Sequence, residues 1–129
     1  MGKKSDEYVL NRVNSVIGKG TVFEGIISTK ETLRVDGLVK GTINSEGTLV
    51  IGNGGKVEGT INTVNVLVGG EVEGEIFASN NVEANPTGRI FGSIHTKNLI
   101  VDEKAIFQGT CEMLEENGEE SEWEEVKEQ

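Results

Sequence analysis

Lys56-Val57-Glu58-Gly59-Thr60-Ile61 places one apolar residue two positions before a glycine and another two positions after it. The same surroundings recur at intervals of 15 to 18 residues around Gly25, Gly41, Gly59, Gly74, Gly92 and Gly109. The position two residues before each glycine holds Phe23, Val39, Val57, Val72, Ile90 and Phe107, and the position two residues after it holds Ile27, Ile43, Ile61, Ile76, Ile94 and Cys111. Two columns filled with apolar residues in this way indicate six copies of one structural repeat.

Each repeat has the pattern of β-strands and not of a helix. Apolar residues alternate with polar ones, which is the period of a strand with one buried face. A second alternating pair, such as Leu49/Ile51 or Val66/Val68, follows in each unit and is bounded by turn-forming residues. A unit this short cannot bury its apolar residues alone, but coils stacked on one another bury them in ladders. The sequence therefore predicts an all-β fold, a single β-helix (solenoid) of about six coils with flexible polar tails. The repeated glycine predicts a corner or a close backbone approach that excludes a Cβ atom or needs a positive φ.

The formal charge of −10 is concentrated at the C-terminal end. Residues 112–129 contain nine glutamates against Lys127 alone, which gives this segment −8 and leaves −2 for residues 1–111. A nearly neutral body can approach copies of itself without strong repulsion, while a charged tail favours solubility. We expect three parts: a flexible N-terminal segment at 1–14, the β-helix at 15–113 and an acidic disordered tail at 114–129.

Composition also argues against several partners and compartments. No basic stripe is interleaved with aromatic residues, so we expect no nucleic-acid partner. No apolar run approaches the ~20 residues of a membrane-spanning helix. Residues 1–16 lack the apolar stretch and cleavage site of a secretory signal. The single cysteine, Cys111, forms no internal disulfide, and a reducing cytosol is the simplest compartment for it.

Residues that support catalysis are few and isolated. A zinc site of the kind found in hexapeptide-repeat enzymes needs several ligands, and the chain offers one histidine, His95, and one cysteine. We expect His95 to be a solvated surface residue. The six-residue period of such enzymes fails at Thr29 and Thr63. The glycine-rich segment 52–57 lacks the Ser or Thr after Lys56 and the following helix that a phosphate-binding loop requires. We therefore predict no catalytic residue, no metal, no cofactor and no nucleotide.

The succession of repeats resembles the bactofilin family of polymer-forming bacterial cytoskeletal proteins. The resemblance runs from about residue 15 to residue 113, and the segments that carry it are Val16 to Gly25, Leu33 to Gly41 and Leu99 to Met113. It implies a right-handed β-helix, polymerisation without nucleotide, a role in cell shape and frequent attachment to the inner membrane. The handedness comes from the family alone.

The two ends of the solenoid are the expected polymer contacts. Terminal coils carry unpaired backbone groups, and neither terminal segment resembles an apolar lid. Phe23 and Phe107 stand in the first and last coils, where the middle coils carry Val or Ile. We expect them to expose apolar surface in a single subunit and to form the polymerisation interface together with Ile106 and Cys111. The alternative is that each phenylalanine fills the wider end of its own core, and Cys111 also fits as a small buried residue.

The N-terminal segment has two interpretations, which stay open. Its lysines and apolar residues suit contact with an anionic membrane surface, through Lys3, Lys4, Tyr8, Val9 and Leu10. Asp6 and Glu7 oppose such contact, and the segment also fits a flexible leader or a partial lid on the first coil.

The sequence thus predicts a structural protein that assembles with itself, end to end, into filaments. Such filaments would scaffold cell-shape or cell-envelope processes in the cytoplasm or at the cytoplasmic face of the inner membrane, with cell-wall-modifying enzymes as recruited partners. The alternatives are a non-polymeric β-helical binding or spacer module and, third, a hexapeptide-repeat-like acyltransferase.

Overall fold

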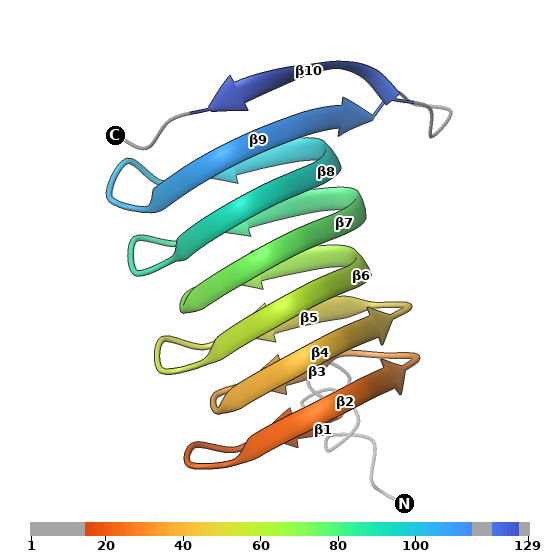
Figure 1. Cartoon of the computed structure of the whole chain (residues 1–129), viewed down its shortest axis with the longest axis vertical. Helices are drawn as coiled ribbons and strands as arrows, with labels where there is room; N and C mark the ends of the chain where they lie inside the picture. The colour runs from red at the N-terminus through yellow and green to blue at the C-terminus, as the bar shows by residue number, and fades with distance from the viewer. Residues whose placement is uncertain (1–14, 115–119, 127–129) are drawn as a thin grey trace, which may run out of the picture.

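The computed structural model describes residues 15–114 and 120–126, and in these residues one continuous sheet winds into a solenoid (Figure 1). Its strands are β1 (Ser15–Ile17), β2 (Val22–Thr29), β3 (Leu33–Val35), β4 (Leu38–Ser45), β5 (Thr48–Ile51), β6 (Lys56–Val68), β7 (Glu71–Ala84), β8 (Arg89–Val101), β9 (Ile106–Leu114) and β10 (Glu120–Val126). Strands β1 to β9 pair in parallel, each with the coil above or below.

Each turn of the solenoid has a short side and a long side. Strands β1, β3 and β5 are short sides, and β2, β4 and β9 are long sides. Strands β6, β7 and β8 are continuous over both, with a register irregularity where β6 and β7 round the corner. The described residues thus contain about six turns between residues 15 and 113, as the sequence predicts.

The repeated glycines stand directly above one another in the middle of the long sides. Gly59 pairs with Gly41 on one side and with Gly74 on the other. Its φ of +139° lies in a region that residues with a Cβ atom rarely adopt. A Cβ atom added there would also lie 1.9 Å from the carbonyl oxygen of Gly41. The predicted positive φ and close backbone approach are therefore confirmed, whereas Gly59 lies within strand β6 and not at a corner.

The core is a single stack of aliphatic side chains. The residues on the two predicted inward columns are buried in the middle turns, and Ile61 is 0% exposed. Those of the first turn, Phe23 and Ile27, are partly buried against the same core. The short sides contribute inward pairs such as Leu49 and Ile51, which are also buried. Burying aliphatic side chains at each level stabilises every turn against its neighbours.

Hydroxyl groups close the corners after the long sides. Ser45 and Thr63 are buried, and their side chains donate to the carbonyl oxygens of Glu31 and Gly47 at 3.2 and 2.9 Å. A buried carbonyl group without a partner is costly, so these hydroxyls suit the position better than aliphatic residues. The corner explains why Thr63 interrupts the aliphatic pattern.

The chain continues past the last turn into β10, which pairs antiparallel with β9. The acidic composition of residues 114–129 predicts a disordered tail there and not a strand. Leu114 is also part of β9. The right-handed sense of the β-helix, which the family resemblance implies, stays a prediction.

Candidate assembly surfaces

The N-terminal end of the solenoid has an open edge. Among the described residues, β1 pairs only with β3, and β2 only with β4, so the outer edges of both strands lack a partner strand. Large apolar side chains lie exposed in this turn: Val16 is 55%, Val22 59% and Ile26 70% exposed. An open parallel edge beside exposed apolar side chains is a ready template for another chain.

The C-terminal end is covered in part. On the long side, β10 occupies the outer edge of β9. On the short side, residues 98–101 of β8 pair with β7, and no further described strand lies on them. Leu99 and Val101 are only partly buried there, and Ile100 is 53% exposed. Among the described residues the two ends therefore differ: both sides of the first turn lack an outer strand, but only the short side of the last turn does.

The four predicted interface residues lie in the terminal turns, Phe23 in the first and the other three in the last. The expectation that Phe107 exposes apolar surface in a single subunit is wrong, because its side chain is 1% exposed and belongs to the core. Cys111 is 2% exposed, with its sulfur 3.4 Å from Sδ of Met113. Phe23 and Ile106 are partly buried. Which of the four residues contact another subunit stays a prediction.

The predicted membrane-contact residues Lys3, Lys4, Tyr8, Val9 and Leu10 lie outside the described residues. Within the described part of the chain, no helix is long and apolar enough to cross a membrane.

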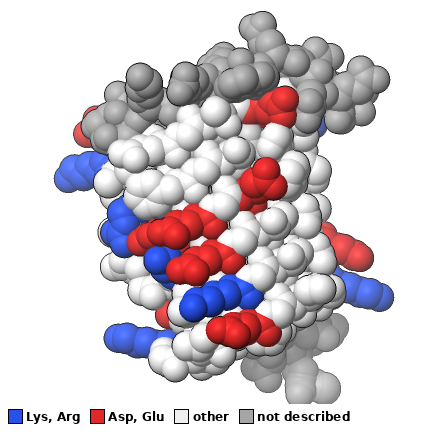
Figure 2. All heavy atoms as spheres, in the orientation of Figure 1, with Lys and Arg blue, Asp and Glu red and all other residues white. Residues whose placement is uncertain are grey.

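The outer face of the long sides carries a network of ion pairs. Lys56 Nζ lies 3.2 Å from Glu58, 3.6 Å from Glu71 and 3.4 Å from Glu73, and Arg89 lies 3.1 Å from Glu71. The hydrogen bond from Arg89 holds the pKa of Glu71 below its usual value, and the bond to Glu58 raises the pKa of Lys56. Figure 2 shows acidic and basic side chains alternating on this face. These charges pair with one another within the subunit and across adjacent turns.

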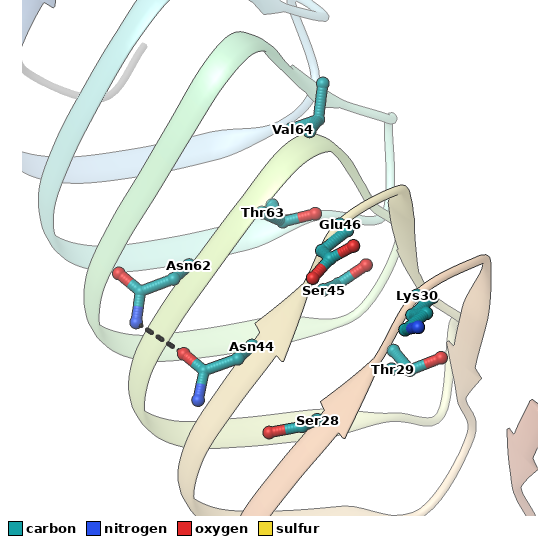
Figure 3. Close-up of a pocket in the computed structure, with 9 residues that line it drawn as sticks. All are labelled: Ser28, Thr29, Lys30, Asn44, Ser45, Glu46, Asn62, Thr63 and Val64. Atoms are coloured by element: carbon teal, nitrogen blue, oxygen red, sulfur yellow. Dashed lines mark hydrogen bonds between the residues drawn. The ribbon is translucent and has the colours of Figure 1, made fainter.

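A hollow of about 530 Å³ lies over the corners of the first turns, lined by Ser28, Thr29, Lys30, Asn44, Ser45, Glu46, Asn62, Thr63 and Val64 (Figure 3). The amide of Asn62 donates to Asn44 at 2.9 Å, so these two side chains are bonded to each other across the layers. The hollow holds one basic and one acidic residue, Lys30 and Glu46, and no histidine or cysteine. No described group of three or more His, Cys, Asp or Glu side chains could hold a metal ion.

His95 is less exposed than the sequence predicts. Its side chain is 19% exposed and stacks on Phe77 with 4.4 Å between ring centroids. Its Nδ1 lies 2.6 Å from Glu112. In three successive turns, the position three residues after the repeated glycine holds Phe77, His95 and Glu112. Aligning this third column of the repeat would have brought them together.

Comparison with known proteins agrees with this architecture. The sequence profile of the bactofilin family, described as polymer-forming cytoskeletal, matches residues 15–112. The chain belongs to the bactofilin family. The match covers the whole solenoid, and as a member of a non-enzymatic cytoskeletal family this bactofilin is not an enzyme, as the sequence predicted.

The chain is also similar to individual bactofilins. Bactofilin BacO of Myxococcus xanthus (strain DK1622) is 38% identical over 100 residues, which cover 78% of this chain and 79% of the relative. Bactofilin BacP of the same organism is 32% identical over 100 residues, and the match spans 42% of its length. The cryo-EM structure of Thermus thermophilus bactofilin double helical filaments superposes with a TM-score of 0.72 at 34% identity, covering 75% of this chain and 96% of that one.

Proposed function

We propose that this bactofilin assembles end to end, without nucleotide, into filaments that serve as a cytoplasmic scaffold for cell-shape or cell-envelope processes. The observation that carries the proposal is the open first turn, where β1 and β2 have no outer partner strand among the described residues. Stacking the open short side of another subunit's last turn on β1 would continue the parallel ladder there, and a second solenoid on this end would bury the apolar end of the core. Phe23 would contact the next subunit at this end, and Ile106, Phe107 and Cys111 would shape the contact at the other.

The test is negative-stain electron microscopy of the purified chain in a buffer with a chelator and without nucleotide. We expect filaments, because no step of the stacking requires phosphate hydrolysis or a metal. A protein that stays monomeric at high concentration, or that polymerises only after ATP or GTP is added, would refute the proposal.

We further propose that the N-terminal segment brings these filaments to the inner membrane. Lys3 and Lys4 precede the apolar group Tyr8, Val9 and Leu10, a pattern that suits a negatively charged membrane surface. One copy of so small a patch binds weakly, and many copies along a filament bind together. Filaments should co-sediment with vesicles of anionic lipid and not with neutral vesicles. Filaments of a chain lacking residues 2–14 should stay in the supernatant, and co-sedimentation of that variant would exclude the segment as the anchor.

A further inference from the structure

The outer face of the short sides carries a column of six side chains, one from each turn. The column, here called the short-face column, runs in order through Val16, Arg34, Val50, Leu67, Glu83 and Ile100. Four of the six are apolar, and the two at the ends are 55% and 53% exposed. This composition sets the short face apart from the long side, whose central outer face is covered by paired charges.

The order of the column is symmetric about its middle. It reads apolar, basic, apolar, apolar, acidic, apolar from the first turn to the sixth. Reversing the column therefore exchanges Arg34 with Glu83 and leaves every other position apolar. Two such columns that face each other in opposite directions place Val16 against Ile100, Arg34 against Glu83, and Val50 against Leu67.

We propose that two copies of this chain pair side by side through their short faces, with the solenoid axes antiparallel. The occupant of this face is thus a second copy of the chain, and the inference rests on the proposed function, because the paired copies would belong to two neighbouring filaments. The double helical filaments of the Thermus thermophilus relative establish that a bactofilin can pair filaments, without specifying a face for this chain.

Charge complementarity selects the antiparallel arrangement. In a parallel pairing in register, Arg34 would oppose Arg34 and Glu83 would oppose Glu83. Like charges held close together across a contact are unfavourable, and opposite charges fix the register. In the antiparallel pairing each contact gains two Arg34–Glu83 pairs.

The neighbouring turn residues agree with the same direction. Asp36, Asn85 and Asp102 follow the short sides of the second, fifth and sixth turns, and their backbone amides bond to the preceding coil. Antiparallel pairing places Asp36 against Asn85, and Asp102 against Gly18. Neither aspartate therefore opposes another acidic side chain.

Arg34 can serve both its own subunit and the partner copy. Its Nε donates to Asp36 at 2.8 Å, and the side chain remains 42% exposed. A guanidinium has five N–H donors in a fork, so the bond to Asp36 engages only part of it. Glu83 is exposed, between the buried Val82 and Ala84. Both charges therefore project from the face on which the contact is proposed.

The contact is small, which explains why it would act between filaments. Six layers spaced ~4.8 Å apart give a column roughly 25 Å tall and only about three residues wide. Such an area is well below the about 800 Å² per partner of a stable pair of free subunits. Repetition along two filaments adds the contacts together.

The test uses charge reversal and its repair. Arg34→Glu and Glu83→Arg each set like charges against one another, and the double variant restores an opposite pair with the signs exchanged. The matched controls are Lys40→Glu and Glu75→Arg, which make the same changes in net charge at exposed positions of the long side. Electron micrographs give the fraction of filament length that is paired, and circular dichroism verifies the fold of each variant.

We expect paired filaments from the wild type, both controls and the double variant, and single filaments from both single variants. Arg34→Glu also places a glutamate beside Asp36 and could disturb the fold for that reason. If Arg34→Glu does not fold, Glu83→Arg alone tests the contact. Pairing that survives Glu83→Arg, or a double variant that stays single, would overturn the antiparallel short-face contact. Wild-type filaments that are always single would overturn this inference and leave the proposed function standing, whereas a wild type without any filaments would refute the proposed function first.

Discussion

Phe23 and Ile61 both point into the solenoid, but they differ in what lies above and below them. Ile61 pairs with Ile43 on one side and Ile76 on the other, and it is fully buried. Phe23 has Val39 on one side, and no described strand on the other. Both side chains therefore point inward, but Ile61 is packed between two turns, whereas Phe23 lies at the end of the stack.

Two substitutions should separate these roles. Ile61→Ala opens a cavity between two layers and should cost about 2–5 kcal/mol, which lowers the melting temperature whether or not filaments form. Phe23→Arg should lower it much less, because the guanidinium can reach solvent at the open end. In a filament the same arginine would be buried without a partner, which is strongly unfavourable, so we expect folded subunits without filaments.

The control for Phe23→Arg is Glu24→Arg, which introduces the same side chain in the same turn at an exposed position. This control should polymerise. Thermal melts, sedimentation and microscopy on the three variants check the expectation. Normal filaments from Phe23→Arg would show that the first turn is not a polymer contact.

The sequence predicted the direction of side chains better than their exposure. The sequence pattern predicts that the column containing Phe107 points inward and that Phe107 exposes apolar surface, but this residue is 1% exposed. The pattern also predicts that His95 points outward into solvent, but Phe77 and Glu112 cover it. Direction follows from a period of two within one strand, whereas exposure depends on neighbouring layers and on how the last turn closes.

At the scale of elements, the strands and their register could be predicted because every turn repeats the same cues. The glycine marks the long side, and the alternating pair marks the short side. The pairing of Gly25 with Gly41 and of each further glycine with the next follows from aligning the repeats. The structure also explains Thr63 at the corner of this repeat, because its hydroxyl donates to the carbonyl oxygen of Gly47.

Strand β10 could not be predicted in this way. Its sequence, Glu120-Ser121-Glu122-Trp123-Glu124-Glu125-Val126, has no repeated apolar alternation and belongs to no repeat. Its pairing with β9 is antiparallel, unlike the pairing between the coils. An open edge accepts almost any extended backbone, because main-chain hydrogen bonds do not depend on the side chain. A sequence pattern therefore cannot distinguish such a strand from a solvated tail.

At the scale of the whole molecule, the solenoid is a stack in which each turn contacts only its neighbours. Stability in such a stack is approximately a sum over turns and the interfaces between them. The number of turns is then not fixed by a central core, and a whole turn can be removed if the ladders rejoin. Gly59 and Gly74 occupy the same position in adjacent turns, so the segment from 59 to 73 is one complete turn.

Deleting residues 59–73 should therefore give a shorter folded solenoid. The deletion joins Glu58 to Gly74, which then pairs with Gly41 at the position that Gly59 held, and the spacing of the repeat is kept. We expect a β-rich circular dichroism spectrum and one cooperative melting transition, at a lower temperature because the buried residues of one turn are lost. The control is the smaller deletion of residues 59–66, which brings Leu67 to the glycine position, where an added Cβ would lie 1.9 Å from the carbonyl oxygen of Gly41. The longer deletion should thus be the milder one. If the two variants unfold alike, the turns do not act as independent layers, and the description of the molecule as a stack of equivalent turns is wrong.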